Sequence, residues 1–298
     1  MPQLATAAEP WVERRRRTAE LRQRYPFAGE LLDLYDALLG VQEDAYDEAQ
    51  SAPPPLDSLA AYVAELVVPG VVNVTVAAGP DKLRAALAQP SESADPRDIV
   101  GRWIRGEEQA PVHRYIARAS LAPVLEALGP EAGAACAGPR DGRHCPHCGG
   151  PPQLSYFAPA TEDLATGPRY LLCARCHASW GHARMTCAGC GESSSSRLAI
   201  FSEKGTTSGE RGSVVRGLPG GNGEVDGKHD GEHARPSEAV FPHVRIEACE
   251  TCRRYLLSID LATNTRAVPL VDEMAALPLD LYASEQGLLK ITPNLMGF

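Results

Sequence analysis

Eight of the nine cysteines stand in four Cys-x-x-Cys pairs, and this pattern constrains the fold more than any other feature of the 298-residue chain. The pairs are Cys145/Cys148, Cys173/Cys176, Cys187/Cys190 and Cys249/Cys252. A Cys-x-x-Cys turn lets two thiolates converge on one ion, and two such turns supply the four soft ligands of a tetrahedral site. The sequence therefore predicts two metal sites, each built from two turns.

An internal repeat and the spacing indicate which turns combine. The first and third pairs are each followed by a glycine, which permits a left-handed backbone, whereas the second and fourth pairs lack it and each follow a short β-like run. Between Cys148 and Cys173 lie 24 residues; between Cys190 and Cys249 lie 58, of which 20 remain when the 38 residues of 202–239 are set aside. We therefore expect sequential pairing, with an interleaved arrangement as the main alternative. The expected ligands are Cys145, Cys148, Cys173 and Cys176 at one site and Cys187, Cys190, Cys249 and Cys252 at the other.

Four thiolates close the coordination sphere of a metal ion, so neither site has an open position for substrate or activated water. The ligand set does not separate zinc from iron, and iron would add electron transfer. Cys145-Pro-His-Cys148 also occurs in thioredoxin-fold disulfide oxidants, but the glycines and prolines at 149–152 oppose an immediate helix. The rest of the sequence has no phosphate-binding glycine loop and no nucleophile constellation, so we expect a protein that is not an enzyme.

Single residues near the pairs are expected to play minor roles. The four histidines nearest the pairs are expected to stay outside the ligand sets, and Cys136 is expected to be a buried or incidental thiol. These histidines are His144, His147, His177 and His182.

Apolar periodicity divides the chain into helical and β-like parts. We assign 1–135 to a helical domain, 136–192 to the first metal ribbon and the start of the second, 193–269 to the second ribbon with a disordered insertion at about 202–239, and 270–298 to a C-terminal helix and tail. Asp95-Pro96 is a helix start, and Val71–Val76 reads as a strand or a buried extended segment. The predicted fold class is α+β: an N-terminal all-helical domain, two tandem rubredoxin-like or zinc-ribbon modules and a C-terminal helix.

Charge and hydropathy limit the compartments and the classes of partner that we expect for this protein. A net charge of −9 and 6% aromatic residues disfavour a nucleic-acid-binding surface. No stretch approaches 18 uninterrupted apolar residues and no signal-peptide core is evident, so we expect a cytoplasmic protein without membrane insertion, where paired cysteines bind metal rather than form disulfides. Glu30–Glu48 contains seven acidic residues and no Lys or Arg, a face that would attract a basic partner segment.

The cysteine order and the residues around it resemble the FdhE family of formate dehydrogenase accessory proteins. The resemblance rests on Arg169–Cys176 before Trp180, on Glu247–Leu256, and on Val268–Tyr282 followed by Glu285-Gln-Gly287. It implies a non-enzymatic chaperone for assembly or maturation that binds the catalytic subunit of a respiratory formate dehydrogenase in the cytoplasm. It also implies two rubredoxin-type metal ions on the eight cysteines named above, with iron favoured over zinc.

The sequence departs from the family pattern at two places, and two other functions remain as alternatives. Pro278 is expected to interrupt the C-terminal helix, and the insertion at 202–239 is longer than the family suggests. The alternatives are a rubredoxin-like redox protein, acting by electron transfer or thiol chemistry, and a zinc-ribbon nucleic-acid-binding protein. Self-association into a homo-oligomer is also left open.

Overall fold

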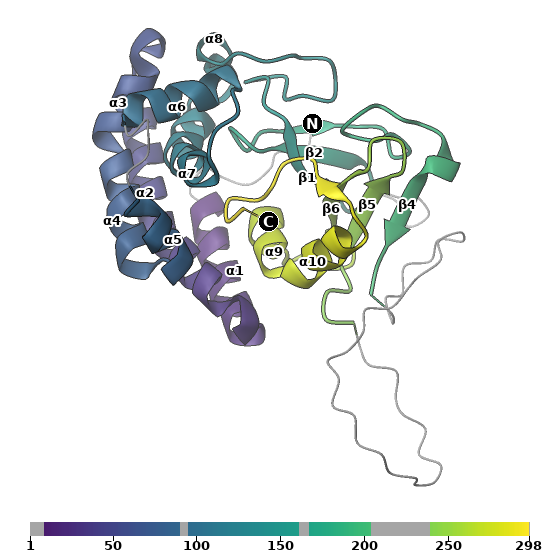
Figure 1. Ribbon diagram of the computed structural model, residues 1–298. Helices are drawn as coiled ribbons and strands as arrows, with labels where there is room; N and C mark the ends of the chain where they lie inside the picture. Colours follow the sequence, from purple (N-terminus) through teal and green to yellow (C-terminus); the bar gives the residue numbers. More distant parts are fainter. Residues whose placement is uncertain (1–8, 90–94, 161–166, 204–238, 298) are drawn as a thin grey trace, which may run out of the picture.

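The computed structural model describes residues 9–89, 95–160, 167–203 and 239–297, in which a helical layer stands beside a mixed β-sheet (Figure 1). The helices of the first layer are α1 (Glu9–Arg24), α2 (Gly29–Ser51), α3 (Leu59–Leu66), α4 (Val68–Ala78), α5 (Asp81–Leu87), α6 (Pro96–Arg105), α7 (Pro111–Leu128) and α8 (Ala132–Ala135). The strands are β1 (Pro152–Phe157), β2 (Arg169–Cys173), β3 (Ser179–Gly181), β4 (Leu198–Phe201), β5 (Val244–Cys249), β6 (Arg254–Asp260) and β7 (Leu289–Lys290). The α+β class is confirmed. Most of the predicted insertion, residues 204–238, lies outside the described residues.

Helix α2 lies at the centre of the helical layer, because its apolar stripe is wide enough to contribute side chains to two hydrophobic cores. Leu34 and Leu38 pack with α4 and α7, whereas Leu32 and Leu39 pack toward the sheet side. Its acidic residues lie on the remaining face, as expected for a helix that buries most of its circumference. The predicted start of α6 is confirmed, because the Asp95 carboxylate accepts a hydrogen bond of 2.8 Å from the backbone N–H of Arg97.

The prediction for Val71–Val76 is wrong, because the segment forms the middle of α4. Val71 and Thr75, four residues apart, are both fully buried against neighbouring helices. This tertiary burial outweighs the β propensity of the valines.

Helices α3 and α4 lie in one apolar segment, Leu56–Ala78. Its most apolar 18 residues have a mean hydropathy of 1.7, and 39% of them are buried inside the protein. It is long and apolar enough to span a membrane, a test that the core helices of soluble proteins also pass.

The two metal-ribbon modules share one continuous sheet of order β3-β2-β1-β6-β5-β4, with β7 pairing with β6. Strands β1 to β3 pair in antiparallel fashion, as do β4 to β6. The two groups join where β1 and β6 run parallel, with Ser155 opposite Ser258. The modules are therefore fused through backbone hydrogen bonds rather than joined only by a linker.

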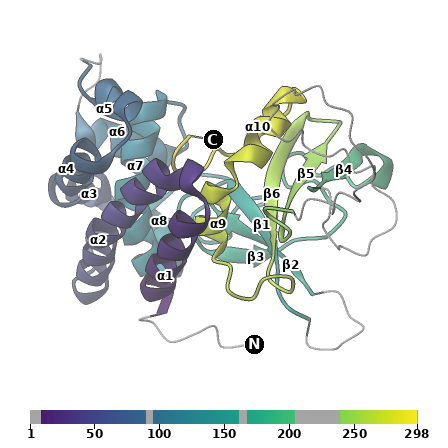
Figure 2. The ribbon, with the colours of Figure 1, turned by 90° about the horizontal axis from the view of Figure 1, so that it is seen from below.

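Two helices, rather than the single one expected, cover one face of this sheet: α9 (Pro269–Ala275) and α10 (Leu277–Glu285). Pro278 lies in the first turn of α10, where its missing N–H is not needed, so the break falls just before it at Ala276. Alternate residues of β5 and β6, such as Ile246 and Leu257, point into the core beneath these helices. Figure 2 shows α9 between α1 and the sheet, and the contacts of α9 with α1, β1 and β6 agree.

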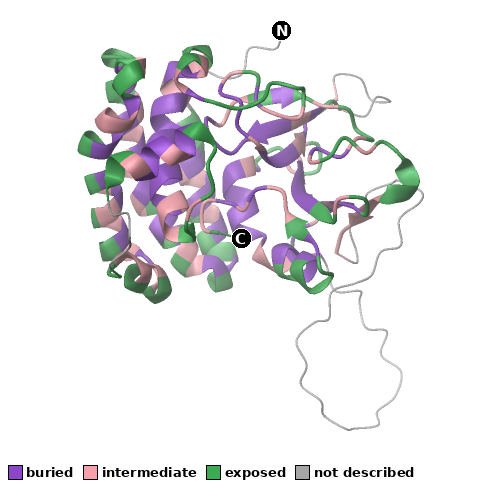
Figure 3. Ribbon diagram, turned by 45° about the horizontal axis from the view of Figure 1, so that its top comes forward, coloured by how far each residue is buried: buried purple, intermediate pink, exposed green. Residues whose placement is uncertain are grey.

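Buried residues run continuously from the helical layer into the sheet (Figure 3), and charged side chains join the layers. Glu126 on α7 accepts a hydrogen bond of 2.6 Å from Arg14 on α1 and one of 2.9 Å from His177, which follows β2. Burial alone would raise the pKa of Glu126, but Arg14 and His177 outweigh it and lower the pKa to about 2. Burial lowers the pKa of His177, so a neutral imidazole donates to the ionised carboxylate at pH 7.

We expect Glu126→Gln to lower the free energy of unfolding at pH 7 by about 3 kcal/mol, because the substitution leaves the buried Arg14 without its charge partner. The folded-state pKa of Glu126 lies below the unfolded value of about 4.3, so its contribution is complete above about pH 5 and is lost as the pH falls toward 2. The difference between the wild type and the variant should therefore shrink on acidification. Urea unfolding at pH 7 and pH 3 measures it, with the exposed Glu131→Gln as the control. A difference that is independent of pH would contradict this account.

Candidate metal centres

The structure gathers the eight paired cysteines into two groups of four, each with all its sulfur atoms within 4.8 Å of one another. The groups are Cys145, Cys148, Cys173 and Cys176, here called centre 1, and Cys187, Cys190, Cys249 and Cys252, here called centre 2. This is the sequential grouping, and the interleaved alternative does not occur. No ninth cysteine joins either group among the described residues, since Cys136 lies apart, buried, with a pKa raised to about 11 by that burial.

The sulfur positions fit a tetrahedral ion. In centre 1 the Sγ atoms of Cys145 and Cys176 are 3.6 Å apart, and those of Cys148 and Cys173 are 3.4 Å apart. In centre 2 the corresponding distances are 3.8 Å and 3.7 Å. Ligands placed tetrahedrally at about 2.3 Å from zinc lie about 3.8 Å from one another. Both groups therefore suit one zinc ion or one iron ion of rubredoxin type, and the donor set does not decide between the metals.

All four turns share one backbone feature, which the sequence indicated for only two of them. The residue after each pair has a left-handed conformation: φ is 69° at Gly149 and 83° at Gly191, but also 55° at His177 and 57° at Arg253. A non-glycine residue in this region is strained by roughly 1 kcal/mol. Both side chains are anchored elsewhere, because His177 binds Glu126 and Arg253 donates to the backbone oxygen of Gln286 at 2.8 Å.

Centre 1 lies inside the protein core. Its four cysteines are at most 3% exposed and belong to the same apolar cluster as Trp103 of α6, Leu128 of α7 and Trp180 of β3. Gly150 leaves room for two of the sulfurs: a Cβ atom there would lie 2.8 Å from the Sγ of Cys173 and 3.2 Å from that of Cys148. The absence of a side chain at this position therefore shapes the sulfur cage.

The sulfurs of centre 1 influence one another strongly. Hydrogen bonds from neighbouring thiols, that of Cys148 first, lower the pKa of Cys145, whereas burial raises the pKa of Cys173 well above its usual value. The same close contacts raise the pKa of Cys176. Four thiolates at this separation repel one another, so holding all four deprotonated requires a cation between them.

Centre 2 lies at the edge of the molecule, where β5 turns into β6. Cys190 is exposed and Cys252 is half-buried, whereas Cys187 and Cys249 are buried. Thr251 of this turn donates a hydrogen bond of 2.7 Å to the Glu192 carboxylate, which joins the two turns of the centre. An ion held here is within reach of solvent and of another protein, unlike one in centre 1.

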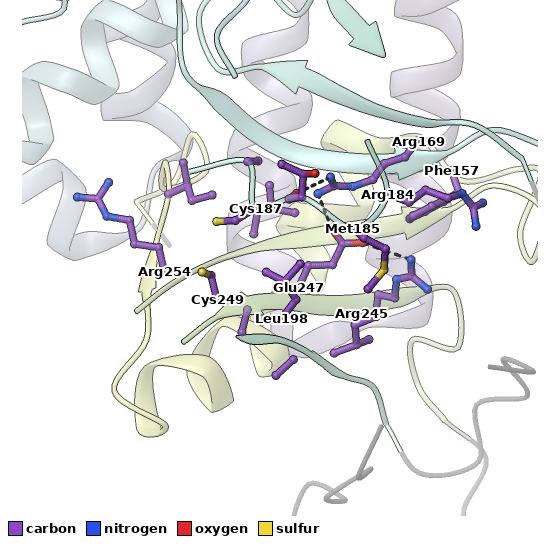
Figure 4. Close-up of a pocket in the computed structure, with 17 residues that line it drawn as sticks. Phe157, Arg169, Arg184, Met185, Cys187, Leu198, Arg245, Glu247, Cys249 and Arg254 are labelled. Atoms are coloured by element: carbon purple, nitrogen blue, oxygen red, sulfur yellow. Dashed lines mark hydrogen bonds and ion pairs between the residues drawn. The ribbon is translucent and has the colours of Figure 1, made fainter. Parts of the chain in front are cut away.

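The remaining sequence candidates lie outside both groups. His144 contacts Asp141 at 2.7 Å, and none of His147, His177 and His182 belongs to a sulfur group. Sequence reasoning missed a cavity of about 290 Å³ beside centre 2, whose walls include Arg245, Glu247 and Cys249 on one face of β5 (Figure 4). The one sequence feature that could have indicated this cavity is the alternation of charged residues along β5, because alternate residues of a strand lie on the same face.

Fold and centres together define an α+β protein with two four-cysteine centres on a shared sheet. The family model described as "FdhE, C-terminal domain" matches residues 229–296. Two curated relatives, each called "Protein FdhE homolog", come from Aquifex aeolicus (29% identity over 155 residues) and Pseudomonas aeruginosa (31% over 152). The alignments cover 52% and 51% of this chain but only 42% and 38% of those relatives.

A solved structure agrees with the overall fold. The crystal structure of the FdhE protein from Pseudomonas aeruginosa matches 98% of this chain and 97% of that chain, with a TM-score of 0.60 and 23% identity. At this identity the match concerns the fold alone. The family model, the curated relatives and the fold of the solved structure all make this chain similar to FdhE proteins.

Gly150→Ala should damage centre 1 selectively, because the new methyl group would press against the sulfurs of Cys148 and Cys173. We expect a loss of about 1–3 kcal/mol in stability and one metal ion bound instead of two. Metal analysis of the purified variant measures the second effect. Gly181→Ala is the matched control, since its Cβ would meet nothing within 4 Å. Two ions retained at wild-type affinity in Gly150→Ala would contradict the assignment.

Proposed function

We propose that this chain is a non-enzymatic accessory protein that binds the catalytic subunit of a formate dehydrogenase during assembly or maturation. The similarity of this chain to FdhE proteins in sequence and fold is the observation that carries the proposal. The chemistry of the centres supports it, because an ion with four thiolate ligands has no open position for a substrate. We assign the protein to the cytoplasm as part of the same proposal, since cysteines that form no disulfide bond are typical of a reducing compartment.

The two centres suit an accessory protein in different ways. An ion in centre 1 would hold the helical layer against the sheet and so keep a docking surface rigid. An ion in centre 2 would lie near the surface, beside Cys190, where a bound client could sense or alter it. In both centres the cysteines of this chain do the binding, and the metal supplies the positive charge that holds four thiolates together.

The outer face of α2 is the surface that we propose for client capture. Of its acidic residues, Asp33 pairs with Arg22 at 2.9 Å and Glu43 pairs with Arg15. The others are exposed, and the described residues offer them no ion pair; they are Glu30, Asp36, Asp44, Asp47 and Glu48. A basic segment of the client would find this unneutralised row favourable, most of all at low ionic strength.

Affinity purification of the full chain from anaerobic cells tests the proposal. We expect recovery of a formate dehydrogenase catalytic subunit, and its absence from cells that express the enzyme would overturn the proposed function. Reversal of three unpaired acidic residues, Asp36→Lys, Asp44→Lys and Asp47→Lys, should reduce recovery in a manner that depends on salt. The control reverses three exposed acidic residues elsewhere: Asp57→Lys, Glu131→Lys and Glu285→Lys. Equal recovery with both variants would remove α2 as the capture surface without removing the function.

A redox role is the second candidate, and the exposure of Cys190 in centre 2 favours it. Electron exchange with a partner is easier when a ligand sulfur reaches the surface. If the protein carries iron in this geometry, its visible absorption should change on reduction. A colourless protein with two zinc ions would exclude this candidate and leave the accessory role intact.

A further inference from the structure

The cavity beside centre 2 lies on the sheet face opposite α9 and α10. Register explains this placement, because Val244 and Ile246 of β5 point toward those helices, whereas Arg245, Glu247 and Cys249 point to the other side. The segment between β3 and Cys187 passes over part of this second face and adds Arg184 and Met185 to the wall. At about 290 Å³ the cavity approaches the size of pockets that hold small molecules.

The cavity contains more positive than negative charge. Four arginines line it, Arg169, Arg184, Arg245 and Arg254, against the single carboxylate of Glu247. Arg169 donates to Glu247 at 2.6 Å, and Arg245 approaches the other oxygen of the same carboxylate at 3.3 Å. One carboxylate shared by two guanidinium groups leaves a surplus of positive charge at this end of the cavity.

Two of these guanidinium groups have buried donors without an acceptor. Arg169 is 4% exposed, and its Nε, like that of Arg245, is buried with no hydrogen-bond partner among the described residues. Buried donors are normally paired, so these two are available to an acceptor that enters the cavity. An oxyanion satisfies such donors better than a neutral oxygen does.

The arginines are held in position around an aromatic ring. The guanidinium carbons of Arg184 and Arg245 lie 4.8 Å and 4.4 Å from the centroid of the Phe157 ring. These cation–π contacts orient both side chains before any ligand arrives. Figure 4 shows Phe157, Arg169, Arg184 and Arg245 toward one end of the cavity and Cys187 and Cys249 toward the other.

The two ends therefore differ in charge. Three of the four arginines lie at one end, whereas Arg254 lies opposite Cys249 at the other, beside the thiolates of centre 2. An anionic group therefore belongs at the end with three arginines. Apolar side chains complete the wall, among them Met185, Leu198, Ile200 and Leu256. They offer contact to an uncharged part of the ligand.

We propose that this cavity binds a small organic molecule that carries a carboxylate or a phosphate group on an apolar body. Arg184 and Arg245 hold the anionic group together with the Nε of Arg169, whose terminal nitrogens already donate within the chain. Leu198, Ile200 and Leu256 contact the apolar part. Such a ligand lies beside Cys187 and Cys249, the two buried cysteines of centre 2, so its occupancy closes the approach to the centre from the cavity side. This assignment is independent of which client the protein binds.

Titration of the full, metal-loaded chain with benzoate, phenyl phosphate and the neutral benzamide tests the proposal by calorimetry. We expect benzoate or phenyl phosphate to bind, the stronger of the two identifying the anionic group, and benzamide to bind at least about tenfold more weakly. Arg184→Gln, which changes an exposed side chain, and Arg245→Gln should each lower the affinity for the anion by about tenfold. Arg197→Gln, which removes an exposed arginine outside the cavity wall, is the matched control.

A second measurement addresses the link to centre 2. The bound anion should slow the release of one of the two metal ions to a chelator, and Arg184→Gln should abolish this protection while its metal content stays at the wild-type value. The proposal is overturned if neither aromatic anion binds, if benzamide binds equally well, or if Arg184→Gln and Arg197→Gln behave alike.

Discussion

The convergence of four sulfurs in centre 1 is the contact on which the rest of the structure depends. Cys145 and Cys148 belong to the loop that follows the helical layer, whereas Cys173 and Cys176 belong to the end of β2. Because these cysteines share an apolar cluster with Trp103 of α6, closing the sulfur cage also seats the helices against the sheet. Binding of an ion in this cage would therefore be coupled to the docking of the two layers, as in small metal-dependent domains.

Centre 2 has the same turns and sulfur spacing but a different environment, and this difference separates structure from reactivity. Its sulfurs stand at the margin of the sheet, and Cys190 reaches solvent. A tetrathiolate ion carries net negative charge, which is stabilised at the surface by water and by nearby arginines. Within one sheet, the internal repeat of Cys-x-x-Cys turns thus yields one centre that is buried and one that a partner or a small molecule can approach.

Local sequence patterns predicted those parts of the structure that depend on local chemistry. The cysteine spacing predicted the two sulfur groups, and Asp95-Pro96 predicted the start of α6, because turns and caps are decided within a few residues. Val71–Val76 was misread because burial between helices decided its conformation. The parallel pairing of Ser155 with Ser258 had no local signal, since its partners lie far apart in the chain and backbone pairing is not specific to residue type.

The arginine-lined cavity follows from that long-range pairing. Glu247 of β5 receives a hydrogen bond of 3.2 Å from Ser155 of β1 and one of 2.6 Å from Arg169 of β2, and it also faces Arg245 on its own strand. These donors come from both metal-ribbon modules and meet at one carboxylate because β1 and β6 join the modules edge to edge. Neither module alone would assemble this set of charges. The proposed anion binding is therefore a consequence of fusing the two modules, which gives a reason for one continuous sheet beyond the placement of two four-cysteine groups.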